Sequence, residues 1–169
     1  MHKGLKEPHV LLASNNPQRL LANLAGILTY TELAKIHAEL DRNTVALFHL
    51  GESHLAFCGH IAASEWRQRI SRYYYAAYNI KRAVSLNFDG SFSTDASDHA
   101  KIDVLPDGFP NAATYATRLK NLRDDRNLAD YSHLASSSDL LISADEAEKL
   151  VTQFKDDSRA FLASRGLAV

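Results

Sequence analysis

The chain has 169 residues, of which 46% are hydrophobic and 23% charged, and its formal net charge is −1. These values are typical of a globular domain and exclude a disordered or fibrous chain, and the length fits one domain spanning residues 1–169. The single cysteine, Cys58, cannot form an internal disulfide, and no segment approaches the roughly 20 apolar residues of a membrane helix. We therefore expect a cytoplasmic protein with no contact to a membrane.

The charges are unevenly distributed along the chain. Basic residues gather in 64–87 and 118–126, whereas acidic residues gather in 139–157. A basic middle and an acidic end can create a one-sided positive surface suited to phosphates. Ordinary solvated helix faces explain the same pattern, so charge alone leaves both interpretations open.

Helical spacing begins in the N-terminal part, where residues 1–42 are expected to form a helical extension. Asn16 can cap a helix whose first residue is Pro17. The apolar positions of this helix are Leu20, Leu24 and Ile27, and those of a second amphipathic stretch are Leu33, Ile36 and Leu40. A third stretch, from about Asn43 to Phe57, opens a bundle expected to span residues 43–165.

The strongest helical pattern runs from Ser64, a favourable capping residue, to Asn87. Its apolar stripe repeats at spacings of four and three, which keeps it facing a partner helix. The stripe consists of Trp66, Ile70, Tyr73, Ala77, Ile80 and Val84, flanked by Tyr74 and Tyr78. We interpret this segment as the central core helix, and core packing as the main role of Tyr73.

A loop is expected from Phe88 to Pro110, with a short helical turn near Asp98–Leu105 and turn signals on either side. A helix follows from Asn111, with Tyr115, Leu119 and Leu122 on its apolar face. A last helix opens at Ser143 with a capping-box pattern that ends at Glu146. The sequence thus predicts an all-α, four- to five-helix up-and-down bundle with an N-terminal helical extension.

The apolar line of the helix that starts at Asn111 leads to Arg126, a charge where a hydrophobic residue is expected. A half-buried guanidinium needs a partner, because leaving the charge unpaired costs several kcal/mol. Asp130 follows after four residues and His133 after seven, so both share the Arg126 face if the helix continues. Arg123 adds a second cation one turn earlier.

Two motifs in this region resemble those of the HEPN family. The run LRDDRNLADY, from Leu122 to Tyr131, is similar to the family's arginine-asparagine-alanine-aspartate-tyrosine motif. The run SRYYYAAYN, from Ser71 to Asn79, is similar to its tyrosine-rich helix. The motifs follow the family's order and are joined by a loop that contains His99.

The resemblance implies a helical bundle that dimerises through the helices carrying the motifs, and a metal-independent endoribonuclease of toxin–antitoxin or phage-defence type. Catalytic members of the family carry an arginine followed after four to six residues by histidine, a pattern that Arg126, Asn127 and His133 fit. Arg126 is then the phosphate clamp and His133 the general acid/base, with Asn127 and Asp130 orienting them and Arg123 and Arg72 binding substrate. RNA is the expected substrate, and no cofactor or metal is implied.

Tyr131 stands where catalytic members most often carry their histidine. In some relatives a tyrosine near this motif is nucleotidylated by a small nucleotidyltransferase antitoxin, and a packed core tyrosine is the alternative. The whole chain has an alternative too: a non-catalytic helical interaction module, in which Arg126 and Asp130 form a structural ion pair.

Two further groups of residues give weaker indications of function. His49, His54 and His60 do not match a metal-binding spacing. The pair Asp98 and His99 can reach the Arg126 face from the loop, but we interpret it first as a surface pair.

Overall fold

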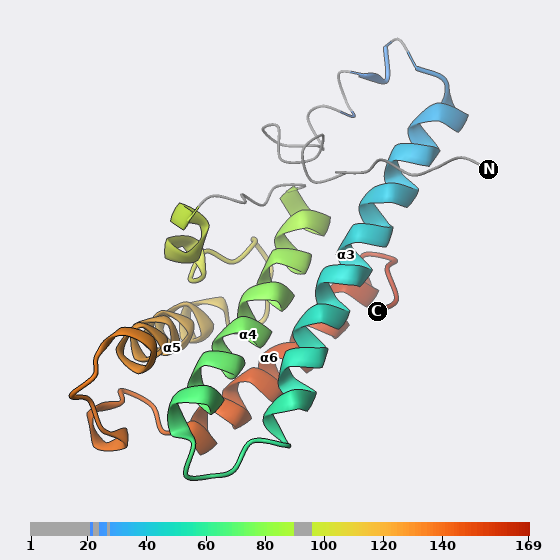
Figure 1. Ribbon diagram of the computed structural model, residues 1–169. Helices are drawn as coiled ribbons and strands as arrows, with labels where there is room; N and C mark the ends of the chain where they lie inside the picture. The colour runs from blue at the N-terminus through green and yellow to red at the C-terminus, as the bar shows by residue number, and fades with distance from the viewer. Residues whose placement is uncertain (1–20, 22–23, 27, 90–95) are drawn as a thin grey trace.

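The computed structural model describes residues 21, 24–26, 28–89 and 96–169. Within these residues it contains α-helices and short 3-10 helices, and no strand (Figure 1). The α-helices are α3 (Tyr30–Cys58), α4 (Trp66–Asp89), α5 (Ala112–Tyr131) and α6 (Ala144–Ser164), and the 3-10 helices are η1 (Ala96–Lys101) and η2 (Ser137–Asp139). The expected all-α bundle is confirmed. Most of the helix expected from Asn16 to Ile27 lies outside the described residues.

Helix α3 is one continuous rod. Thr29 caps it in a full capping box with Glu32, and the helix continues to Cys58. The two amphipathic stretches expected separately are therefore one helix, and the boundary placed between residues 42 and 43 falls inside it. The helix continues because the segment contains no proline, and only one glycine, Gly51, weakens the helix.

Helix α4 lies at the centre and packs against α3, α5 and α6 (Figure 1). Its expected apolar stripe is buried from Ile70 to Val84, and Tyr74 on the flanking row is fully buried as well. The helix begins at Trp66, two residues after the expected cap at Ser64. Burial on nearly every side makes α4 the element against which the other helices are placed.

The last two helices follow the sequence pattern closely. Helix α5 buries Tyr115, Leu119 and Leu122 as expected. Helix α6 begins with the expected capping box between Ser143 and Glu146.

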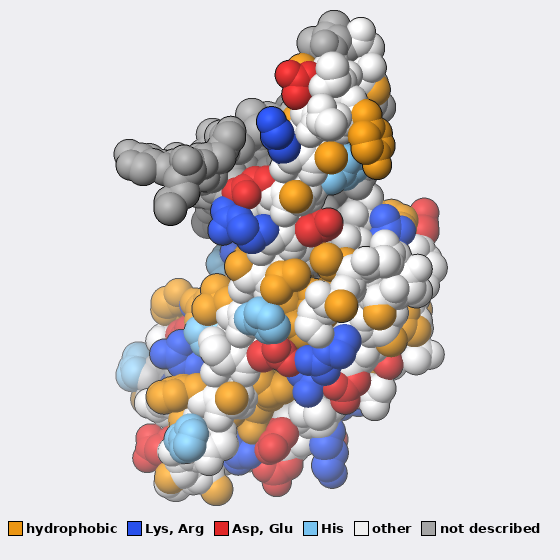
Figure 2. Space-filling model, turned by 90° about the vertical axis from the view of Figure 1, so that its right-hand side faces the viewer, with side chains coloured by type: hydrophobic (Ala, Val, Ile, Leu, Met, Phe, Trp, Pro, Cys, Tyr) orange, Lys and Arg blue, Asp and Glu red, His pale blue; other side chains and the backbone are white. Residues whose placement is uncertain are grey.

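The surface of the described residues gives two further observations. None of their helices is long and apolar enough to cross a membrane. On the face shown in Figure 2, acidic and basic side chains are interspersed rather than separated. That face therefore carries no continuous positive patch.

Gly51 marks the closest approach of α3 to α4. A Cβ atom built at Gly51 would lie 2.6 Å from Cγ1 of Ile80 and 2.8 Å from the carbonyl oxygen of Ala76. The backbone oxygen cannot move away without shifting α4. Only glycine therefore allows this spacing between the two helices.

We expect Gly51→Ala to lower the free energy of unfolding by about 1–3 kcal/mol, the usual cost of overpacking a core. Alanine favours helix by only about 1 kcal/mol, which does not offset the clash. Urea denaturation followed by circular dichroism measures the change. Gly59→Ala is the matched control, because a Cβ there meets only the Ala56 carbonyl oxygen at 3.4 Å. Equal stability of the two variants would contradict the close approach.

Candidate functional site

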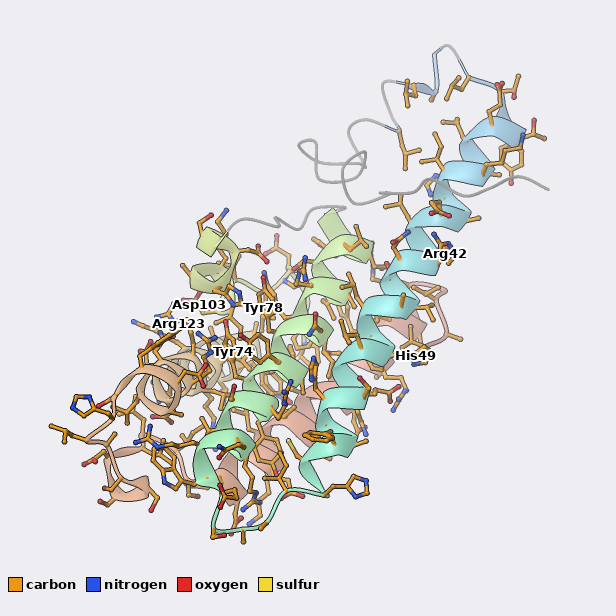
Figure 3. The ribbon with its side chains drawn as sticks, viewed as in Figure 1. Arg42, His49, Tyr74, Tyr78, Asp103 and Arg123 are labelled. Carbon is orange, nitrogen blue, oxygen red and sulfur yellow. The ribbon has the colours of Figure 1, made fainter. Side chains whose placement is uncertain are left out.

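Three tyrosines of α4 face α5 and η1. The hydroxyl of Tyr74 lies 2.6 Å from Nδ1 of His99, and the hydroxyl of Tyr78 donates to a carboxylate oxygen of Asp98 at 2.9 Å. Tyr75 directs its hydroxyl to α5. Figure 3 shows Tyr74 and Tyr78 on the same side of the bundle as Arg123, whereas Arg42 and His49 lie on α3 at the other edge. We call Tyr74, Tyr75, Tyr78, His99 and Arg126 the tyrosine–arginine cluster.

Arg126 is the charged member of this cluster. One of its terminal nitrogens donates to the Tyr75 hydroxyl at 2.6 Å, and its Nε lies 2.7 Å from a carboxylate oxygen of Asp130. The other terminal nitrogen donates to the side-chain oxygen of Asn127 at 3.2 Å. The side chain is 15% exposed. The expected half-buried guanidinium, with Asp130 as its partner one turn later, is confirmed.

Aromatic rings complete the surroundings of Arg126. Its guanidinium carbon lies 5.6 Å from the ring centre of Tyr74, 5.3 Å from that of Tyr75 and 5.4 Å from that of Tyr131. Such positions allow cation–π attraction. Burial acts to lower the pKa of Arg126, but the Asp130 carboxylate and the tyrosines outweigh it and raise the pKa overall. The cation is thus held firmly in its charged form.

His99 is the histidine that the structure brings to Arg126. Its ring stacks on Tyr78 with centres 4.2 Å apart, and it contacts both Tyr74 and Tyr75. Burial, and then the charge of Arg126, lowers the pKa of His99 below 6.5. The imidazole is therefore neutral at pH 7.

The protonation of the Tyr74–His99 pair follows from its surroundings. Burial raises the pKa of Tyr74 well above its ordinary value, so the phenol keeps its proton. Two arrangements fit this contact: the hydroxyl donates to Nδ1 of a ring that is protonated on Nε2, or Nδ1–H donates to the hydroxyl and leaves Nε2 free to accept a proton. The interpretation of Asp98 and His99 as a surface pair is wrong: Asp98 is buried and His99 half-buried, because both supply partners for buried tyrosines.

Contrary to expectation, His133 does not lie on the face of α5 that carries Arg126. Helix α5 ends at Tyr131, and Ser132 takes an extended backbone with φ −96° and ψ 104°. His133 is exposed, and among the described residues it has no hydrogen bond, ion pair or ring contact. The expectation that α5 continues to His133 is wrong.

A distant arginine fixes the end of α5. The two terminal nitrogens of Arg67, on α4, donate to the carbonyl oxygens of Ala129 and Ala135, each at 2.6 Å. The first carbonyl belongs to the last turn of the helix and the second to the segment after it. Arg67 therefore satisfies a free helix-end carbonyl and holds the chain where it turns away.

The remaining expected residues have separate surroundings. Tyr131 is 73% exposed, so the alternative of a packed core tyrosine is wrong. Asn127 is exposed and accepts from Arg126. Arg123 pairs with Asp124 and donates to the carbonyl oxygen of Ala100 at 3.3 Å, which ties η1 to α5.

Arg72 lies in an open groove of about 560 Å³ along α4, between the C-terminal ends of α3 and α5. We call it the α3–α5 groove. Its apolar lining is Phe57, Ile61 and Ala129, and its polar lining is Arg67, Gln68, Ser71, Arg72 and Asp130. Asp130 and Tyr75 connect this groove to Arg126, because Asp130 lines it and Tyr75 lies one turn along α4 from Ser71 and Arg72.

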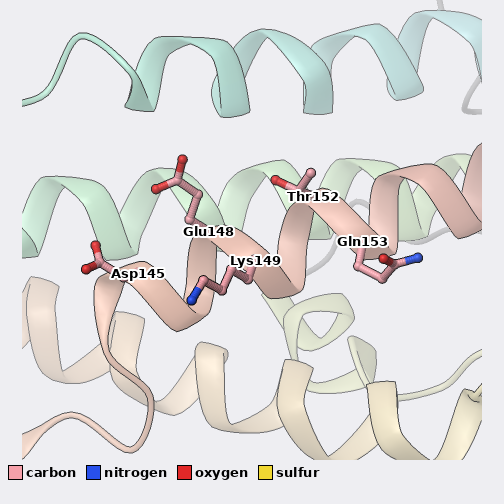
Figure 4. Close-up of a pocket in the computed structure, with 5 residues that line it drawn as sticks. All are labelled: Asp145, Glu148, Lys149, Thr152 and Gln153. Atoms are coloured by element: carbon pink, nitrogen blue, oxygen red, sulfur yellow. The ribbon is translucent and has the colours of Figure 1, made fainter.

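A second hollow of about 640 Å³ lies on α6 (Figure 4). Its lining residues, Asp145 to Gln153, all belong to that one helix. Arg69 and Tyr73 of α4 already bind two of these residues, Asp145 and Glu148, and we assign no ligand to this hollow. The histidines of α3 likewise face different partners: His49 contacts Glu52, and His54 contacts Arg72. Among the described residues, no group of three His, Cys, Asp or Glu side chains could hold a metal ion.

Comparison with known proteins identifies no relative of this chain. No family model, no curated protein and no solved structure matches this chain. The resemblance of its two motifs to the HEPN family therefore rests on the residues themselves.

Asp125 is an important residue that the sequence pattern did not single out. Its carboxylate accepts from the backbone N–H groups of Leu141 and Ile142, at 2.7 and 3.0 Å, and it is almost fully buried. Burial raises the pKa of Asp125, and the two hydrogen bonds oppose that rise. The carboxylate holds the segment before α6 against α5.

We expect Asp125→Asn to lower the free energy of unfolding by about 1–3 kcal/mol, because the amide offers one acceptor where two buried N–H groups need acceptors. Thermal and urea denaturation measure the loss. Asp124→Asn is the matched control and should change stability by less than about 0.5 kcal/mol, since Asp124 is partly exposed and its ion pair with Arg123 is open to solvent on that side. A harmless Asp125→Asn would show that the two N–H groups do not depend on the carboxylate.

Proposed function

We propose that this protein is a HEPN-like, metal-independent endoribonuclease of toxin–antitoxin or phage-defence type, acting on RNA as a homodimer in the cytoplasm. One observation carries the proposal: a half-buried guanidinium and a neutral imidazole, Arg126 and His99, contact the same two tyrosines. In metal-independent RNA cleavage an arginine can stabilise the charge that develops on the phosphate, and a histidine can transfer the proton. The two motifs of the resemblance supply Arg126 and the tyrosines.

The chemistry assigns a role to each group. Arg126 binds the scissile phosphate in place of its contacts with Asn127 and Asp130, and stabilises the charge that develops on it. A neutral histidine accepts the proton of the ribose 2′-hydroxyl, whose oxygen forms a new bond to phosphorus. The bond to the 5′-oxygen breaks, and that oxygen takes a proton from a second, charged histidine. The products carry a 2′,3′-cyclic phosphate and a 5′-hydroxyl.

Two histidines fill these roles in the proposal. His99 serves as the base through Nε2, in the tautomer whose Nδ1–H donates to the Tyr74 hydroxyl, because burial and Arg126 keep the ring neutral. His133, exposed just beyond α5, serves as the acid, reaching the Arg126 of the other protomer across a two-fold contact of the α5 ends. Asn127 and Asp130 orient the guanidinium until the phosphate replaces them.

We expect the purified protein to cleave single-stranded RNA in EDTA and to leave 2′,3′-cyclic phosphate ends. Arg126→Ala, His99→Gln and His133→Ala should each reduce the single-turnover rate by about 100-fold or more. The rate should fall as the pH drops through the pKa of His99, and this fall should lie below pH 6.5 because that pKa is lowered. Gel electrophoresis and end-group analysis measure both effects.

His49→Ala is the matched control for the histidine variants, since His49 is exposed on α3 and contacts only Glu52. It should cleave at the wild-type rate. Full activity of His133→Ala removes that residue from the mechanism, and full activity of His99→Gln removes the proposed base. Absence of cleavage by the wild-type protein would overturn the ribonuclease proposal.

A non-catalytic interaction module is the second candidate, and the contacts of Arg126 favour it. Both terminal guanidinium nitrogens already donate hydrogen bonds, to Tyr75 and Asn127, and Nε lies at ion-pair distance from Asp130 without a hydrogen bond. Large apolar side chains are also exposed around the end of α5: Tyr131, Leu134 and Leu141. An exposed apolar surface of this kind fits a protein partner, and a nucleotidyltransferase antitoxin acting on Tyr131 fits the resemblance.

In that case, incubation with ATP and a small nucleotidyltransferase encoded beside the gene should add one nucleotidyl group to the phenolic oxygen of Tyr131 and release pyrophosphate. Intact mass measurement detects the addition, which should vanish in Tyr131→Phe. Tyr30→Phe is the matched control, because Tyr30 is 85% exposed on α3. Labelling that persists in Tyr131→Phe would contradict the assignment of this residue.

A further inference from the structure

The α3–α5 groove contains Arg72, whose guanidinium forms no ion pair with any residue that the structure describes. A terminal nitrogen of Arg72 lies 3.5 Å from Nδ1 of His54, and its guanidinium carbon lies 5.6 Å from the ring centre of Phe57. Among the described residues, no carboxylate lies within ion-pair distance of it. By contrast, Arg67 in the same groove donates to two backbone carbonyls. Arg72 is thus the groove cation that remains available to an anion.

His54 extends the polar side of the groove. Burial, and then the charge of Arg72, lowers the pKa of His54, so the ring is neutral at pH 7. Its Nδ1 then accepts from Arg72, and its Nε2 carries a proton that can be donated. The ring also packs 5.9 Å from that of Tyr75, whose hydroxyl accepts from Arg126. Contacts through His54 and Tyr75 therefore link Arg72 to the tyrosine–arginine cluster.

The rest of the lining suits a planar ring. Phe57 is 52% exposed and offers an aromatic face, and Ile61 adds apolar surface beside it. Gln68 and Ser71 add uncharged hydrogen-bonding groups. Asp130, the acidic member, pairs with Arg126 at 2.7 Å before RNA binds. An aromatic platform beside an available cation is the usual way in which proteins hold a single-stranded nucleotide.

We propose that the α3–α5 groove binds one nucleotide of single-stranded RNA next to the phosphate held at Arg126, with its own phosphate on Arg72 and its base against Phe57. This assignment rests on the proposed function, because it places the substrate strand of that reaction. The groove, at about 560 Å³, lies within the roughly 300–1,000 Å³ range of small-molecule pockets. A paired base is stacked inside a helix and cannot lie on Phe57, so the strand must be single.

The test is fluorescence anisotropy with a labelled RNA oligonucleotide that is 2′-O-methylated and so cannot be cleaved, in EDTA and at several salt concentrations. Arg72→Gln should weaken binding at least fivefold and reduce the number of released counterions by about one. Phe57→Ala should weaken binding about fivefold or more without changing the salt dependence, because it removes stacking and no charge. Arg72→Lys, which keeps the charge, should retain most of the salt dependence.

Arg118→Gln is the matched control, since Arg118 lies on α5, where its charge acts on Tyr115 of the same helix and on Glu146 of α6. It should change binding less than twofold. Thermal denaturation of every variant establishes that it is folded. Equal binding by Arg72→Gln and Arg118→Gln overturns the groove assignment.

The two proposals fail in different ways. If the wild-type protein binds the methylated strand through Arg72 and Phe57 but leaves unmodified RNA intact, the groove assignment holds and the ribonuclease proposal is wrong. If RNA is cleaved and Arg72→Gln binds normally, the reverse is true. If the wild-type protein binds no RNA, both are overturned and the groove is left to a protein partner.

Discussion

The hydroxyl groups of the tyrosines on α4 need hydrogen-bonding partners. Helix α4 is packed on nearly every side, and a buried phenol without a partner costs about 1–3 kcal/mol. The partners come from three other elements of the chain. Glu148 of α6 bonds Tyr73, His99 and Asp98 of η1 bond Tyr74 and Tyr78, and Arg126 of α5 bonds Tyr75. The same bonds that satisfy the core therefore gather the polar groups of the tyrosine–arginine cluster.

This arrangement links stability to the proposed chemistry. Arg126 joins α5 to α4 through Tyr75 and is neutralised by Asp130. A phosphate that binds there competes with Asp130 and Asn127. The loss of these two contacts offsets part of the favourable free energy of phosphate binding. The Tyr75 contact can remain, because it occupies a different nitrogen of the guanidinium. Arg126 is thus oriented before any ligand arrives, which favours precise binding over strong binding.

The sequence predicted what depends on local periodicity. The stripe of α4, the capping box of α6 and the Arg126–Asp130 pair all follow from helical spacing within a few residues. The end of α5 could not be predicted in this way, because Arg67 fixes it from 62 and 68 residues away. The burial of Asp98 and His99 was missed for the same reason: their partners lie on α4, and no signal near them in the chain reveals it.

The observed end of α5 and the burial of His99 determine which histidine lies near Arg126 and can accept a proton. Within one protomer, Arg126 and the neutral His99 meet on the same tyrosines, whereas His133 lies beyond the end of α5 and contacts neither among the described residues. Cleavage of RNA needs a proton acceptor and a proton donor on opposite sides of the phosphorus. A cluster with one neutral imidazole supplies the acceptor alone. The proposed ribonuclease reaction therefore takes its proton donor from outside this cluster, and the proposal assigns that role to His133 of a second copy of the chain.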